Sequence, residues 1–261
     1  MDLELRDRTA MVWGASKGLG LAIAECLAEE GASTMLVARN HQRLDQAVSR
    51  ITAKGGKAAA AAADIGNWQS VEQALSSMRA MFGDPDILIN NSGGPPTIDV
   101  THVDAALWQS QFEAMVLNQM RLTEAVLPAM RARNFGRIIS VSSTSIIEPF
   151  AALAISNSLR AALAGWMKTL ASEVAKDGVT VNLLLPGSFA TERVSDLDRR
   201  AAERQGVDVN EVAQANLRDI PAGRYGEPKE FGQFAGFIAS PKAGYITGSA
   251  LKIDGGATRS L

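Results

Sequence analysis

Short apolar runs alternate along the chain with longer segments in which apolar residues recur every three or four positions. Such runs are typical of buried strands, and the longer segments are typical of helices that cover them. Strands are predicted at Thr9–Trp13, Ser33–Ala38, Lys57–Ala63, Asp86–Asn90, Arg137–Val141, Val179–Leu185 and Ala250–Ile253. Helices are predicted at Leu19–Glu30, Gln42–Ala53, Trp68–Phe82, Leu107–Arg133, Ala151–Lys176 and Pro228–Ala239.

Strands that alternate with helices of this length indicate right-handed βαβ crossovers and a parallel sheet. The expected fold class is α/β, a single-domain Rossmann-type doubly wound parallel sheet of about seven strands with helices on both faces. We expect one domain over residues 1–261. The polar segment 188–220 carries helical pieces but no strand, and we interpret it as a lid on the substrate side.

Composition narrows the function classes. The chain of 261 residues is 46% hydrophobic and has a net charge of −2, which predicts neither nucleic acid nor a membrane surface as a partner. No stretch approaches the ~20 apolar residues that span a bilayer, and no secretory signal is visible, so we expect a cytoplasmic protein. With Cys26, His41 and His102 as the only Cys and His residues, no metal site is expected.

The first strand runs into Gly14-Ala15-Ser16-Lys17-Gly18-Leu19-Gly20 and then into a helix. Glycines allow a tight turn and a close approach of the backbone to a phosphate. The helix N-terminus offers unpaired N–H groups to a pyrophosphate. We therefore predict dinucleotide binding; the alternative is a glycine-rich turn without a ligand.

The end of the second strand indicates which dinucleotide binds. NAD sites place an acidic residue there to hold the ribose 2′-hydroxyl, but this strand ends in Ala38-Arg39-Asn40. Arg39 is suited to a 2′-phosphate, and Lys17 adds a second positive charge. The sequence thus favours NADP(H), with a solvated loop cation as the other interpretation of Arg39.

Several motifs then resemble the short-chain dehydrogenase/reductase family, and within it the 3-oxoacyl-acyl-carrier-protein reductase-like members. They are Gly14-xxx-Gly18-x-Gly20, Asp64-Ile65, Asn90-Asn91-Ser92-Gly93, Asn118, the segment 136–143, Pro186-Gly187, and the segment 248–256. The resemblance runs nearly end to end. The cofactor site that it implies comprises Gly14, Ser16, Lys17, Gly18, Leu19, Gly20, Arg39, Asp64, Ile65, Asn91, Gly93, Pro186, Gly187, Phe189 and Thr191.

The resemblance also implies a catalytic set of Ser, Asn, Tyr and Lys, with the Tyr four residues before the Lys. Ser143 and Asn118 match, whereas the Tyr position holds Ser156 and the Lys position holds Arg160. A Ser hydroxyl is a far weaker acid than a Tyr hydroxyl, whose pKa is about 10, and Arg does not relay protons. We therefore expect an atypical active site made of Ser143, Asn118, Ser156 and Arg160.

The function expected from these residues is an NADP(H)-dependent oxidoreductase acting on a carbonyl or secondary alcohol. The alternative is a cofactor-binding homologue without dehydrogenase activity, such as an inactive subunit or an NADP(H) sensor. The resemblance further implies a homo-oligomer, either a dimer or a tetramer. Alternatives also remain open for single residues: Ser143 as a strand terminator, Asn118 as a helix irregularity, and Arg160 as a surface cation.

Overall fold

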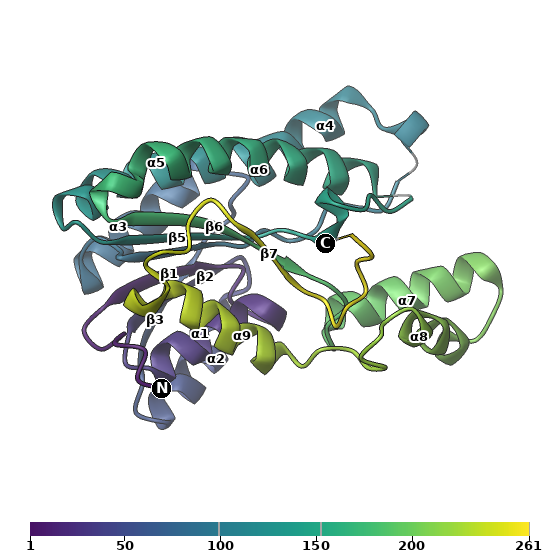
Figure 1. Cartoon of the computed structure of the whole chain (residues 1–261), viewed down its shortest axis with the longest axis horizontal. Coiled ribbons are helices and arrows are strands. Elements are labelled where there is room, and N and C mark those ends of the chain that lie inside the picture. Colours follow the sequence, from purple (N-terminus) through teal and green to yellow (C-terminus); the bar gives the residue numbers. More distant parts are fainter. Residues whose placement is uncertain (99, 152, 261) are drawn as a thin grey trace.

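The predicted strands form one parallel sheet, in the order β3-β2-β1-β4-β5-β6-β7 (Figure 1). The computed structural model describes residues 1–98, 100–151 and 153–260. The strands are β1 (Thr9–Trp13), β2 (Ser33–Ala38), β3 (Lys57–Ala62), β4 (Ile87–Asn90), β5 (Gly136–Val141), β6 (Val179–Pro186) and β7 (Ala250–Ile253). The expected fold class is thereby confirmed.

Helices cover both faces of the sheet (Figure 1). On one face lie α1 (Gly18–Glu29), α2 (His41–Ala53) and α9 (Pro228–Ala239), packed on a core that includes Ile23, Leu44 and Phe231. On the other face lie α3 (Trp68–Phe82), α5 (Asn118–Ala132) and α6 (Ala154–Val174). This second helix layer buries apolar side chains such as Met78 and Val126 against the sheet.

One predicted helix is interrupted in the structure. The segment expected to run from Leu107 to Arg133 consists of α4 (Ala105–Phe112), a π-helical stretch at Glu113–Leu117, and α5. A π-turn inserts an extra residue into the helical repeat and often accompanies a functional side chain. Asn118 directly follows it. The predicted helix at 151–176 begins only at Ala154, and its predicted start includes Ala152, which lies outside the described residues.

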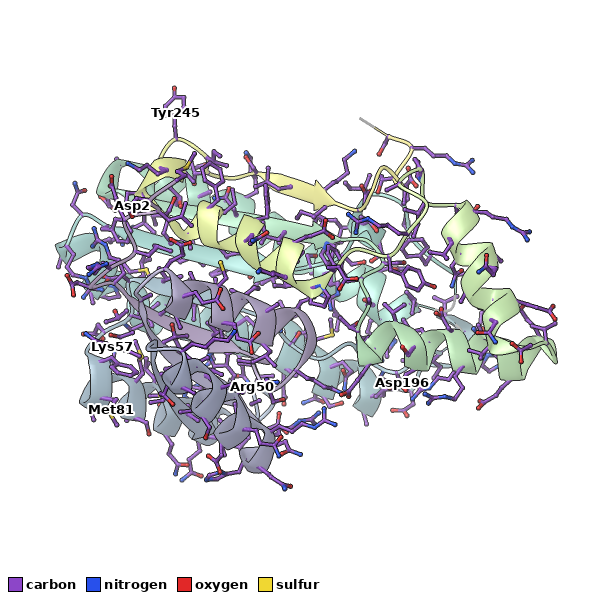
Figure 2. All side chains as sticks on the ribbon, turned by 90° about the horizontal axis from the view of Figure 1, so that it is seen from below. Asp2, Arg50, Lys57, Met81, Asp196 and Tyr245 are labelled. Atoms are coloured by element: carbon purple, nitrogen blue, oxygen red, sulfur yellow. The ribbon has the colours of Figure 1, made fainter. Side chains whose placement is uncertain are left out.

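Parallel strands bring the loops that follow them to a single edge of the sheet. The loops after β1, β4, β5 and β6 carry the glycine turn, Asn91, Ser143 and Gly187 respectively. Beyond this edge lie α7 (Glu192–Gln205) and α8 (Val209–Arg218), away from the two helix layers (Figures 1 and 2). In the described part of the chain, no helix combines the length and the apolar character that crossing a membrane requires.

Candidate functional site

The glycine turn is packed tightly against the loop after β4. Gly14 has a φ of +63°, a left-handed conformation that favours glycine. A Cβ added to Gly20 would lie 2.4 Å from the Gly14 carbonyl oxygen and 2.6 Å from Asn91 Nδ2. Asn91 Nδ2 in turn donates to that carbonyl over 3.5 Å. The start of α1 therefore lies so close to the end of β1 that only glycine fits at position 20.

The outer side of the same turn is open. Gly18 also has a positive φ, +58°, but a Cβ added there would meet nothing nearer than Thr191 Cγ2 at 3.6 Å. No side chain caps α1, whereas Asn40 and Asn67 cap α2 and α3. The first N–H groups of α1 are thus left for an anion, which fits the pyrophosphate of a dinucleotide.

Basic side chains gather beside this turn. Arg39 follows β2 and is exposed, with its Nη1 4.0 Å from Asp64 Oδ2. Lys17 Nζ lies 2.6 Å from Glu192 Oε2, and Arg43 Nη1 lies 3.0 Å from the same oxygen. The sequence singled out Lys17 and Arg39 but missed Arg43. The available signal was its place three residues after the Asn40 cap, in the first turn of the helix that follows β2.

The loop after β3 contacts α5. Asp64 Oδ1 accepts a hydrogen bond from the Gly66 N–H over 2.9 Å, which orders this loop. Asn118 is almost fully buried, and its Nδ2 donates to the Ile65 carbonyl over 2.7 Å. Asn118 thus follows a π-turn and fixes the backbone of a predicted cofactor residue, and its catalytic role stays a prediction.

Other predicted cofactor residues lie at the same edge of the sheet. Gly187 packs against Asp254, since an added Cβ would lie 2.7 Å from the Asp254 Cβ, and Gly93 has open space around it. The ring of Phe189 is buried edge-on against Phe231, with ring centroids 5.2 Å apart. The Phe189 carbonyl accepts the Thr191 N–H over 2.7 Å, which fixes the loop that leads into the next helix. Ser16 lies within the glycine turn, Leu19 packs on the core, and Pro186 ends β6.

Arg160 ties the predicted catalytic residues of α6 to the end of β5. Its Nε donates to Ser156 Oγ over 3.1 Å, and its Nη1 donates to the Val141 carbonyl over 2.9 Å. Burial, and then the charge of Arg193, lower the pKa of Arg160 to about 10, so its guanidinium stays charged at neutral pH. This geometry does not fit an ordinary surface cation. Ser143 Oγ accepts the Ser145 N–H over 3.1 Å, which leaves its own hydroxyl proton to donate.

Arg193 is a second cation of this region that sequence reasoning missed. It projects from the first turn of α7, and its Nη2 donates to the Pro95 carbonyl over 3.2 Å. A Cβ added to Gly94 would lie 2.7 Å from the same Nη2. Arg193 therefore joins α7 to the loop after β4, although the two segments are 98 residues apart in sequence.

The chain has two tyrosines, of which one is hydrogen-bonded to Asp198 and the other projects into solvent. Tyr225 Oη donates to Asp198 Oδ2 over 2.9 Å, and Asp198 also accepts from Asn216 of α8. Tyr245 is fully exposed and projects from the surface in Figure 2. His102 is exposed too, with its Nδ1 2.9 Å from Thr101 Oγ1. None of these contacts joins Tyr225, Tyr245 or His102 to the predicted catalytic residues.

Comparison with known proteins shows the family of the chain. A family model described as Enoyl-(Acyl carrier protein) reductase matches residues 14–258. The 3-oxoacyl-[acyl-carrier-protein] reductases FabG of Vibrio cholerae serotype O1 and Escherichia coli K12 are 35% and 34% identical over 254 residues, which is 97% of this chain and 98% of each relative. The crystal structure of L-sorbose reductase from Gluconobacter frateurii, complexed with NADPH and L-sorbose, superposes with a TM-score of 0.94 at 35% identity and covers 100% of both chains. The chain belongs to the short-chain dehydrogenase/reductase family.

Proposed function

We propose that this chain is an NADP(H)-dependent oxidoreductase that interconverts a carbonyl compound and a secondary alcohol, with an atypical active site. The observation that carries the proposal is the open glycine turn with Lys17, Arg39 and Arg43 beside it. A 2′-phosphate is matched by such a cationic group, whereas a free 2′-hydroxyl needs an acidic acceptor after β2. The NADPH bound to the sorbose reductase supports the same cofactor.

When bound, NADPH would supply a hydride to the carbonyl carbon. Ser143 has a free hydroxyl proton, and Arg160 has N–H donors beyond the two that it uses. In this scheme both donate hydrogen bonds to the oxygen as it gains negative charge. The proton that the alcohol oxygen takes up comes from solvent in this scheme, because the Ser156 hydroxyl is a poor acid and the Arg160 guanidinium stays charged at neutral pH. Segment 188–220 closes the substrate side.

A second function has one specific observation in its favour. Ser156 Oγ and the Arg160 guanidinium bond to each other, where the family pattern requires a Tyr and a Lys. The chain would then bind NADP(H) without turning it over. FabG and L-sorbose reductase, as named relatives, favour the active alternative with a 3-oxoacyl thioester or a ketose as substrate.

Single-turnover reduction distinguishes the two functions. Purified protein is mixed with NADPH and a panel of 3-oxoacyl thioesters and ketoses, and loss of NADPH absorbance is followed. We expect turnover by the native chain, and about a 10²-fold lower rate for Ser143→Ala with unchanged NADPH affinity. Ser145→Ala is the matched control, since its buried hydroxyl has no partner among the described residues.

The double variant Ser156→Tyr with Arg160→Lys tests the second function, binding of NADP(H) without turnover. One outcome is that the native chain binds NADPH but reduces nothing on the panel, whereas the double variant reduces a substrate. The chain is then a binding protein, and the oxidoreductase proposal is wrong. If the native chain does not bind NADPH, both functions fail.

A homo-oligomer, a dimer or a tetramer, is part of the proposal. Phe112 and Leu117 lie along the α4–α5 segment and are 41% and 39% exposed in the single chain. A second copy would cover them. Light scattering should give a mass of two or four 27.6 kDa chains, and a monomer at micromolar concentration would contradict this.

A further inference from the structure

Glu192 pairs with two of the basic side chains beside the glycine turn. It is the first residue of α7, directly after the Thr191 cap. Its carboxylate lies 2.6 Å from Lys17 Nζ and 3.0–3.1 Å from Arg43 Nη1. Three segments that are far apart in sequence, the glycine turn, α2 and α7, thus meet at one carboxylate.

Lys17 and Arg43 form a small anion-binding site, and the carboxylate of Glu192 occupies it. Lys17 and Arg43 are about half exposed, and both donate to the same carboxylate. Those two hydrogen bonds are the main cause that lowers the pKa of Glu192, so the carboxylate is ionised at neutral pH. Arg39, the remaining cation at this end of the site, lies 4.0 Å from a different carboxylate, that of Asp64.

A 2′-phosphate needs the same donors. In the proposed function, the adenosine end of the cofactor lies between the glycine turn and the end of β2, where Lys17, Arg39 and Arg43 are the basic groups. A phosphate and a carboxylate that share two cations lie only a few ångströms apart and repel each other. The dinucleotide without the 2′-phosphate makes no such demand on Lys17 and Arg43.

We propose that Glu192 determines cofactor specificity by competing, from within the chain, with the 2′-phosphate of NADP(H) for Lys17 and Arg43. The inference rests on the proposed function, because it assumes that the dinucleotide binds at the glycine turn. Glu192 weakens the binding of phosphorylated dinucleotides and leaves NAD(H) unaffected. The preference for NADP(H) over NAD(H) is therefore smaller than Arg39 and Lys17 would produce in the absence of Glu192.

Equilibrium binding to Glu192→Gln tests this competition. The variant keeps the size of the side chain and removes its charge. We expect the Kd for NADPH and for 2′-AMP to fall about threefold to fivefold, the upper part of the range of a solvent-exposed ion pair. The Kd for NADH and for 5′-AMP should stay within about twofold. The difference should shrink at 0.5 M salt, because exposed charges are screened.

Two further variants isolate the cause. Glu203→Gln removes an exposed carboxylate from the same helix and should change no Kd. In a background of Lys17→Met with Arg43→Met, Glu192→Gln should have no effect on NADPH binding, since the shared cations are gone.

The results that overturn the inference are distinct. Unchanged or weaker NADPH binding by Glu192→Gln overturns the inference. An equal increase in affinity for NADH also overturns it, because the effect would then act on the pyrophosphate that both cofactors share. A native chain that binds neither dinucleotide overturns the proposed function instead.

Discussion

At the residue scale, the glycines of the first turn differ in what each one permits. Gly20 lets α1 approach the end of β1, because any Cβ there would overlap the Gly14 carbonyl. Gly18 serves a different purpose, since a Cβ there would make only ordinary van der Waals contact with Thr191 and its positive φ is what opposes a side chain. Gly20 therefore allows close packing, and Gly18 allows a ligand to approach the turn.

Alanine substitutions should separate these two effects. Gly20→Ala is expected to destabilise the fold by about 1–3 kcal/mol or more, as overpacking against backbone does. Gly18→Ala is expected to cost about 1–2 kcal/mol from the left-handed conformation, and to raise the Kd for NADPH tenfold or more. Urea unfolding and NADPH titration measure the two quantities. Equal stability of native chain and Gly20→Ala would contradict the packing argument.

Local residue types revealed only part of the site. Lys17 and Arg39 could be predicted because Lys17 lies within the glycine turn and Arg39 directly follows β2. Glu192 and Arg193 could not be predicted, since their partners Lys17 and Pro95 are 175 and 98 residues away. Such contacts depend on how α7 leaves the sheet, and spacing along the chain carries no information about that.

At the element scale, strand pairing overrides intrinsic preference. Six consecutive alanines, residues 58–63, favour a helix by propensity, yet Lys57–Ala62 pairs in register with Ser33–Ala38 as the edge strand β3. The sequence predicted this strand from its flanking turns. The π-turn before Asn118 could not be predicted, because the same apolar periodicity describes an α-helix with or without one extra residue.

The start of α9 gives a prediction for pH. Glu230 accepts the Glu227 N–H in a capping box and pairs with Arg224, and these contacts lower its pKa to about 2. Since the folded-state pKa lies below the usual value, the stabilisation is present above about pH 4.5 and is lost as the pH falls towards 2. Glu230→Gln should therefore lower the Tm at pH 7 slightly, and the two melting curves should converge near pH 2.

Glu124→Gln provides the control for this effect. Glu124 is an exposed residue of α5, and its substitution should leave the Tm unchanged at every pH. A Tm difference between the native chain and Glu230→Gln that stays constant from pH 7 to pH 2 would show that the charge of Glu230 does not contribute to the stability of α9.

At the scale of the whole molecule, the candidate site draws on both halves of the sheet. The glycine turn and Arg39 belong to β1 and β2, whereas Ser143, Gly187 and α7 follow β5 and β6. A ligand that contacts both groups of loops connects elements that share one continuous sheet. Binding should then stabilise the whole chain as a single unit rather than one loop of it.

Thermal unfolding with saturating cofactor measures that stabilisation. NADPH at a hundred times its Kd should add about 2.7 kcal/mol to the free energy of unfolding, which for a chain of this size raises the Tm by about 5–10 °C in one transition. NADH at the same concentration should raise the Tm less, because it lacks the phosphate that the basic group binds. Gly18→Ala should reduce the shift with either cofactor, whereas Glu192→Gln should enlarge it with NADPH alone. A shift that splits the transition in two would mean that the cofactor stabilises only one group of loops, and that the site does not join the two halves of the sheet.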